Sequence, residues 1–361
     1  MTANSLSASS ALETLRRQLR AYEQTLDRSK RKRLGQFFSG ARASSLLAAL
    51  SIRGQERTIV DPMAGHGDLL DAAAMRCGSM GLSVQLTAVE IDPPTAELAG
   101  RRLRLCSEVR GHSAETIETN AFKPSLWTGE RSPGSFDLVI TNPPYVRYQE
   151  HSSARGAPGG RFDAGDVRAA LRELVLMMPD RAEAQAWSAL IEGYSGLADL
   201  SVPCWMLCSL LVKPGGTLAL VVPQTWMNRD YAKIIQYIQL RFFEPLIVVE
   251  EHGVGWFEDA LVPTTLVISR RLLTHEAIVP VSSRPETART TAIAAIRPAA
   301  ADSRSLVGRV FAGPDPDAGF AQWLLAPSPE SVDQITVRRV PWAEQWQTVS
   351  ARCRHEHWFR D

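Results

Sequence analysis

Six short hydrophobic runs, rich in β-branched residues, recur between residues 58 and 268. They are Thr58–Val60, Leu86–Ile91, Phe136–Ile140, Thr217–Val222, Leu246–Val249 and Thr265–Ile268. Several are almost entirely apolar, which is typical of strands that are covered on both faces. Helical stretches separate the runs, and this alternation predicts an α/β fold with a doubly wound, mainly parallel sheet. Ligands in such a fold bind at the carboxyl ends of the strands.

The N-terminal region has a helical pattern instead. Hydrophobic residues at alternating steps of three and four positions predict one helix over residues 8–28. They are Leu12, Leu15, Leu19, Tyr22 and Leu26. This seam either packs on the body of the same protein or binds a partner, such as a second copy of the chain. The basic run Arg28–Arg33 follows it, and we interpret this run either as a solvated turn or as a contact for phosphate.

Breaks in the hydrophobic pattern divide the chain into three parts. Residues 1–34 are expected to form a helical arm and residues 35–272 the main domain. Within that domain, residues 151–198 form an insertion that begins as a Gly-, Ser- and Arg-rich loop and continues into helices. Residues 273–361 are expected to be a linker and a short C-terminal region. The linker assignment depends on residues 280–305, whose Ala, Arg, Ser, Thr and Pro content predicts a poorly packed segment.

Composition narrows the class of protein. A chain of 361 residues with 45% hydrophobic and 22% charged residues is typical of a globular protein. Forty Lys and Arg residues balance 39 Asp and Glu residues, so a nucleic-acid surface would have to come from local clusters. We find no apolar run of about 18 residues and no export signal. The five cysteines lack the spacing of metal ligands. We therefore expect a cytoplasmic protein with reduced thiols, no membrane span and no metal.

A strand, a glycine turn and a helix start follow one another in residues 58–70. Gly65 and Gly67 allow the backbone to approach a ligand closely, and the amides of the helix N-terminus then face that ligand. Asp61, at the end of the strand, can accept hydrogen bonds from an ammonium group. A dinucleotide site would need a third glycine where this chain has Leu70, so the dinucleotide pattern is not fulfilled.

The next strands add candidates for binding a nucleoside. Glu90 ends the run Leu86–Ile91, and a carboxylate there can bind both hydroxyl groups of a ribose. Ile91, which follows it, is assigned to the same cofactor contact. Further along the chain, Asn120 and Phe122 place a polar side chain beside an aromatic one, a pair that can hold an adenine ring.

The most informative stretch is the strand that ends in Asn142, Pro143, Pro144 and Tyr145. The prolines remove two amide donors and stiffen the turn, which leaves carbonyl oxygens free to accept hydrogen bonds. The exocyclic amine of a base is a poor nucleophile because its lone pair is delocalised into the ring. Asn142 Oδ1 and a carbonyl of the Pro-Pro segment can accept its two N–H groups and aim the lone pair at an electrophile. Tyr145 offers a ring on which the base can stack.

Together, the Asp-Pro-x-x-Gly-x-Gly and Asn-Pro-Pro-Tyr motifs resemble those of the N6-adenine DNA methyltransferases of type I and fused type II restriction–modification systems. The resemblance covers about residues 30–270. It implies the class I S-adenosylmethionine-dependent methyltransferase fold, S-adenosylmethionine as cofactor, and a flipped adenine in DNA as substrate. It also implies that Asn142, Pro143, Pro144 and Tyr145 form the catalytic motif.

Two further segments match this family. Gly35–Ser39 resembles the Gly-Gln-Phe-Phe-Thr-Pro motif that helps to wrap the cofactor, which assigns Phe37, Phe38 and Ser39 to cofactor binding. This chain has Ser39-Gly40 in place of Thr-Pro, so the hydroxyl is kept and the rigid proline is lost. Phe257 matches the aromatic residue that stacks on the flipped adenine. Asn120 stands where the family usually has an aspartate for the cofactor's adenine, and we expect this to alter affinity without preventing binding.

Two other functions stay open. Methyltransferases that act on another planar amine or amide, in ribosomal RNA or in protein glutamine, use the same tetrapeptide. They typically lack both the Gly-Gln-Phe-Phe motif and the Phe257 segment. A non-catalytic DNA-binding subunit with this fold is the second alternative, and the intact Asp61, Glu90 and Asn142 argue against it.

The region after Ile268 is short compared with the family's target-recognition domains. It is either a reduced or partial recognition region, or a specificity or restriction subunit supplies recognition, or the sequence is a fragment. Its tryptophans and arginines are the remaining candidates for contacts with bases.

Overall fold

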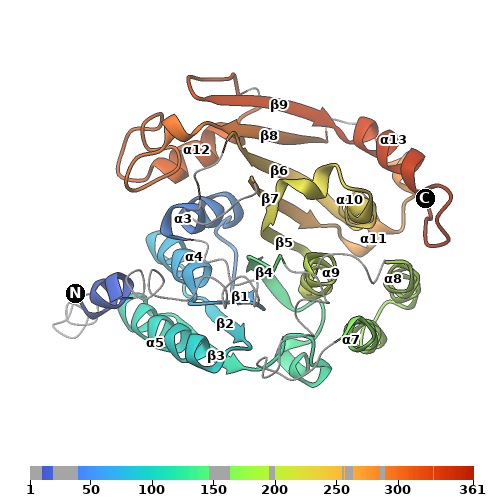
Figure 1. The fold of residues 1–361 in the computed structure, drawn as a ribbon, viewed down its shortest axis with the longest axis horizontal. Coiled ribbons are helices and arrows are strands. Elements are labelled where there is room, and N and C mark those ends of the chain that lie inside the picture. The colour runs from blue at the N-terminus through green and yellow to red at the C-terminus, as the bar shows by residue number, and fades with distance from the viewer. Residues whose placement is uncertain are drawn as a thin grey trace.

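The computed structural model describes residues 10–18, 40–145, 163–194, 200–253, 256, 263–284, 289–327 and 329–361. A sheet with the strand order β3-β2-β1-β4-β5-β7-β6-β8-β9 forms its centre (Figure 1). The strands are β1 (Thr58–Asp61), β2 (Gln85–Glu90), β3 (Ser113–Glu118), β4 (Phe136–Thr141), β5 (Val212–Pro223), β6 (Phe243–Glu251), β7 (Thr264–Arg271), β8 (Thr290–Ile296) and β9 (Ile335–Pro341). All six predicted runs fall in strands, to within one residue, which confirms this part of the prediction.

The sheet is mainly parallel, as the alternating pattern predicts. β3, β2, β1, β4 and β5 are parallel neighbours, and β6 is parallel to β8. β7 lies antiparallel between β5 and β6, and β9 pairs antiparallel with β8. The first five strands therefore end at one edge, where ligands of such sheets bind.

Helices cover both faces of the sheet. They are α3 (Gly40–Ser51), α4 (Asp68–Ser79), α5 (Pro93–Arg110), α7 (Ala164–Leu176), α8 (Arg181–Gly193), α9 (Ser201–Leu211), α10 (Lys233–Arg241), α11 (Thr274–Ala277), α12 (Pro316–Leu324) and α13 (Trp342–Cys353). Short 3-10 turns lie at η1 (Pro124–Leu126), η2 (Gly129–Arg131), η3 (Gln224–Met227), η4 (Asp230–Ala232), η5 (Val281–Ser283) and η6 (Pro298–Ala300). In Figure 1, α3, α4 and α5 lie on one face and α7 to α10 on the other.

Each face has its own hydrophobic core, because successive side chains of a strand point to opposite sides. In β1, Ile59 lies in the core with α3, α4 and α5, whereas Val60 lies in the core with α7 to α10. Leu138 and Val139 divide in the same way in β4. This two-sided burial explains why the strand sequences are apolar at consecutive positions.

The expectation of a linker at residues 280–305 is wrong. This segment contains β8, which is paired on both sides by β6 and β9. Ala292, Ala294 and Ile296 are buried in the core shared with α12. Small alanines and threonines give the segment a composition like that of a linker, although several of them are buried in a strand that is paired on both sides. The sheet therefore continues through the C-terminal region.

The segment Lys213–Gly216 lies inside β5, between Val212 and Thr217, which both pair with β4. The pairing with β4 shifts its register between Phe136 and Leu138, and Gly215 has a φ angle of 81°. The strand therefore begins with an irregular section.

The described part of the N-terminal seam packs on its own protein. Residues 10–18 form a helix, as predicted, and lie beside α5 (Figure 1). Leu12 and Leu15 are buried, with 2% and 4% of their surfaces exposed. A partner-binding role for these two residues is therefore wrong, since the same chain already covers them. Leu19, Tyr22 and Leu26 lie outside the described residues.

Candidate active site

The predicted site residues lie at the ends of four neighbouring strands. Along one edge of the sheet, Asn120 follows β3, Glu90 ends β2, Asp61 ends β1 and Asn142 follows β4. The four strands are parallel, so these ends lie at the same edge. β1 pairs with both β2 and β4, which places the predicted catalytic asparagine beside the predicted cofactor residues despite their distance in sequence.

The glycine turn between β1 and α4 has the backbone that its sequence predicts. Gly65 and Gly67 have φ angles of 54° and 79°, in the left-handed region that favours glycine. The Ala64 amide donates to the Val89 carbonyl at 2.9 Å, which holds the turn against β2. Among the described residues, no side chain caps the N-terminus of α4 at Gly67, so the first amides of this helix are candidates for binding a ligand.

Asp61 is buried, with 1% of its surface exposed. Its Oδ1 accepts the Met63 amide at 3.0 Å, while its Oδ2 has no hydrogen-bond partner among the described residues. Burial raises the pKa of Asp61 to about 7, and the charges of Glu90 and Asp68 add to this rise, whereas the Thr141 hydroxyl and the Met63 amide oppose it. An unpaired buried oxygen is costly, so this side chain is suited to a cationic donor from a ligand.

Glu90 joins the glycine turn to the end of β2. Its carboxylate accepts the amides of Gly65 and Asp92, each at 2.9 Å. Burial raises its pKa, and the backbone amides of Asp92, Gly65 and Ile91 act in the opposite direction. A carboxylate has about four lone-pair sites, so it can accept from a ribose hydroxyl in addition to these amides. Ile91 follows Glu90 and is half-buried.

Asn120 and Phe122 lie after β3, and the side chain of Asn120 contacts the backbone of Phe122. Asn120 Oδ1 accepts the Phe122 amide at 2.9 Å, which occupies one of its two lone pairs. The Phe122 side chain is 6% exposed and belongs to the core with Val89 and Trp127. A role for this pair in holding an adenine ring stays a prediction.

Asn142 and Tyr145 are connected directly. The Tyr145 hydroxyl lies within hydrogen-bonding distance of both Asn142 Oδ1 and the Val221 carbonyl at the end of β5. A hydroxyl has one hydrogen, so it donates to one of these oxygens at a time. Pro143 between them is buried, and Asn142, Pro144 and Tyr145 are half-buried. Sequence reasoning expected the tyrosine ring to stack on the base and did not anticipate this contact with the asparagine.

Four predicted site residues lie outside the described part of the chain. They are Phe37, Phe38, Ser39 and Phe257. Their assigned contacts with cofactor and base stay predictions.

A known protein family matches a segment of the chain that contains several of these site residues. Residues 85–245 match the Eco57I restriction-modification methylase family. The matched segment is a little under half of the chain and includes Glu90, Asn120 and Asn142. This confirms the resemblance to restriction–modification methyltransferases that the motifs indicate. No curated protein matches the chain.

Solved structures show the same fold over most of this chain. The modification subunit of a putative type I restriction enzyme from Vibrio vulnificus YJ016 has a TM-score of 0.56 at 14% identity, covering 94% of this chain and 61% of its own. The type IIG restriction endonuclease BpuSI has a TM-score of 0.54 at 15% identity, and the match covers 85% of this chain and 30% of BpuSI. The type I methyltransferase subunit from Streptococcus thermophilus has a TM-score of 0.53 at 17% identity, and the match covers 86% of this chain and 57% of that subunit. This chain thus spans less than two thirds of each.

S-adenosylmethionine is the cofactor expected for this fold and family, and the site residues fit it. Its ammonium group matches the unpaired Asp61 oxygen, and its ribose hydroxyls match the remaining lone pairs of Glu90. Within the described ranges, no group of three or more His, Cys, Asp or Glu residues is placed to hold a metal ion. In the same part of the chain, no helix is long and apolar enough to span a membrane.

Cofactor binding is expected to depend on pH through Asp61. A pKa of about 7 means that this carboxyl is mostly neutral at pH 6 and mostly charged at pH 7.5. Because the charged form is needed to accept from an ammonium group, the Kd for S-adenosylmethionine should rise roughly tenfold between pH 7.5 and pH 6. Calorimetry at both values measures this change. A flat profile for the wild type would contradict the role of Asp61.

Asp61→Asn is the control for this pH dependence. It should bind more weakly at both pH values, with little change between them. The folded-state pKa lies above the unfolded value, so the stability that neutral Asp61 contributes is lost as the pH rises through about 7. The ligand-free variant should therefore melt at a higher temperature than the wild type at pH 8.

Proposed function

We propose that this chain transfers a methyl group from S-adenosylmethionine to the N6 amine of a flipped adenine in DNA, as part of a restriction–modification or related defence system. The observation that carries the proposal is the row of Glu90, Asp61 and Asn142 at the ends of β2, β1 and β4. This row places the predicted nucleoside-binding residues next to an amide side chain, which can accept a hydrogen bond from an exocyclic amine. The match of residues 85–245 to restriction–modification methylases supports DNA as the substrate.

Asn142 activates the amine by accepting one of its N–H groups, and a carbonyl of Pro143 or Pro144 accepts the other. Bound S-adenosylmethionine supplies an electrophilic methyl group on a positively charged sulfur. The two acceptors would draw the nitrogen towards tetrahedral geometry and direct its lone pair, so that positioning and electrostatics replace a strong base. The N–C bond would form as the sulfur–methyl bond breaks, S-adenosylhomocysteine would be the leaving group, and the amine would release one proton to solvent. The Val221 carbonyl gives the Tyr145 hydrogen another acceptor. When Tyr145 donates there, its hydrogen is not directed at Asn142 Oδ1.

An adenine inside a duplex cannot reach this edge, so the base must leave the stack. We assign Tyr145 and Phe257 to stacking on the extruded base, a contact worth about 1–3 kcal/mol per base in nucleic-acid sites. A 2-aminopurine at the target position should then fluoresce more strongly when the protein binds. An unchanged 2-aminopurine signal, when the matching duplex with adenine at that position is methylated, would rule out this assignment.

The substrate class is tested with labelled S-adenosylmethionine and three acceptors: DNA, ribosomal RNA and protein. Label should pass to DNA and not to the others. Transfer to RNA or protein alone would favour the methyltransferases that use Asn-Pro-Pro-Tyr on other planar amines or amides. Cofactor binding without transfer to any acceptor would favour a non-catalytic subunit.

Recognition of a specific DNA sequence is assigned to a partner or to a further domain. The described C-terminal region adds β8, β9, α12 and α13 to the sheet and its cores. Three of its tryptophans, Trp342, Trp346 and Trp358, are buried there and do not face a DNA groove. A specificity or restriction subunit, or a second copy of the chain, would supply the contacts with bases. Co-purification from the native host tests for such a partner, and sharp methylation of one motif by the chain alone would contradict it.

A further inference from the structure

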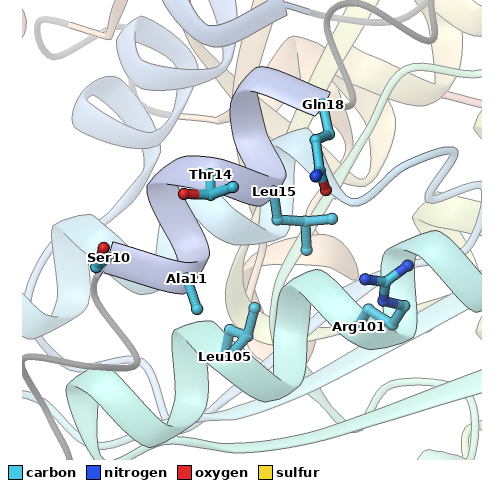
Figure 2. Close-up of a pocket in the computed structure, with 7 residues that line it drawn as sticks. All are labelled: Ser10, Ala11, Thr14, Leu15, Gln18, Arg101 and Leu105. Atoms are coloured by element: carbon cyan, nitrogen blue, oxygen red, sulfur yellow. The ribbon is translucent and has the colours of Figure 1, made fainter.

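The helix at residues 10–18 sits directly on the helix that follows β2. Figure 2 shows Ala11 and Leu15 of this helix facing Leu105 and Arg101 of α5, around a shallow pocket of about 490 Å³. Leu12 and Leu15 are buried. These apolar contacts hold the helix on α5. The position of the helix determines which groups its polar side chains can contact.

One of these polar residues enters the protein. Arg16 donates from Nε and Nη2 to the two carboxylate oxygens of Asp71 in α4, at 2.8 Å and 2.6 Å. The Asp71 side chain is 6% exposed and that of Arg16 is 17% exposed. Burial alone would raise the pKa of Asp71, but the hydrogen bond and charge of Arg16 and the charge of Arg102 lower it. Asp71 is therefore a buried anion that is neutralised by two cations.

The second cation connects Asp71 to the glycine turn. Arg102 of α5 lies 3.1 Å from Asp71 and also forms an ion pair with Asp68, the first residue of α4. Arg102 Nη1 also donates to the His66 carbonyl at 3.2 Å. His66 lies between Gly65 and Gly67, so one guanidinium holds both the turn and the start of the helix behind it. A continuous chain of contacts thus runs from Arg16 to the turn that borders the cofactor edge.

We propose that Arg16 is a positioning residue for the cofactor site: by sharing Asp71, it leaves Arg102 in place to hold Asp68 and the His66 carbonyl. Without Arg16, Arg102 is the remaining cation beside a buried carboxylate, and unpaired buried charge is costly. Arg102 then shifts towards Asp71 and away from the turn. The N-terminal helix therefore keeps the cofactor turn in its binding geometry from a distance, without touching the cofactor.

The test compares Arg16→Gln with Arg17→Gln. Arg17 lies on the same helix, is exposed and contacts only Thr14 among the described hydrogen-bond partners. Arg16→Gln should raise the Kd for S-adenosylmethionine roughly tenfold, the size typical of changes within a coupled network. Arg17→Gln should stay within about twofold of the wild type. Equal Kd values for the two variants would overturn the proposal.

Hydrogen exchange of the cofactor-free protein gives a readout that does not depend on catalysis. Backbone amides of residues 64–68 should exchange roughly tenfold faster in Arg16→Gln than in Arg17→Gln. If exchange in the turn is unchanged while residues 10–18 exchange faster, Arg16 only docks the helix and the proposal is wrong. This comparison remains valid if the protein proves to methylate something other than DNA.

A double variant separates positioning from loss of helix docking. Arg16→Gln combined with Asp71→Asn removes the anion along with its cation, so Arg102 is free to hold Asp68 and His66 again. The double variant should recover most of the affinity that Arg16→Gln loses. An affinity as low as that of Arg16→Gln would show that competition for Arg102 is not the cause.

Discussion

Asn142→Ala is expected to lower the rate of methyl transfer about a hundredfold to a thousandfold, the cost typical of losing one preorganised hydrogen-bonding group at a reacting centre. The side chain follows β4, which lies beside β1 and its Asp61, and it is half-buried. Its amide is assigned to the amine of the substrate and to no part of the cofactor. The Kd for S-adenosylmethionine should therefore stay within about twofold of the wild-type value, while single-turnover transfer to DNA falls.

Two further variants sharpen this experiment. Asn142→Asp keeps an oxygen that can accept from the amine, so it should retain more activity than Asn142→Ala. Asn228→Ala changes an exposed asparagine after η3 and should behave as the wild type. Transfer by Asn142→Ala within tenfold of the wild-type rate would remove Asn142 from the mechanism.

Glu90→Ala is expected to weaken binding of S-adenosylmethionine by at least about a hundredfold, because it removes a charged acceptor from two hydroxyl groups and hydrogen bonds to charged groups are worth roughly 1.5–3 kcal/mol each. The substitution also releases the amides of Gly65 and Asp92, which now donate to this carboxylate. Both effects act on the cofactor edge. Calorimetry without DNA measures the loss.

Glu118→Ala provides a matched control for Glu90. Glu118 pairs with Glu90 in the register of β3 and β2, at the same edge of the sheet, but it is exposed. Its removal should leave the Kd unchanged. If Glu90→Ala and Glu118→Ala bind equally well, the ribose is held elsewhere.

The strand predictions succeeded where burial on both faces makes the sequence uniformly apolar. β1, β2, β4 and β5 are of this kind in their central residues. β3 escaped prediction because it is an edge strand with partly exposed, polar residues, Ser113–Glu118. β8 was misassigned because its alanines and threonines carry little hydrophobic signal, although they are buried against neighbouring elements. Local composition does not reveal which segments a later helix will cover.

The site likewise contains residues that the sequence predicts and contacts that it does not. Asp61, Glu90 and Asn142 could be placed from sequence because each follows or ends an apolar run, and parallel strands bring such positions together. The contact of Tyr145 with Asn142 and Val221 could not be predicted, since it depends on how β5 lies beside β4. The pair of Arg16 and Asp71 spans 55 positions, and no periodicity connects two segments so far apart.

Mass spectrometry of nucleosides from DNA incubated with S-adenosylmethionine and the protein identifies the methylated base directly. The proposed geometry predicts N6-methyladenine with the wild type and little or none with Asn142→Ala. Methylcytosine alone, or equal N6-methyladenine from both proteins, would contradict the claim that Asn142 presents the adenine amine for methylation.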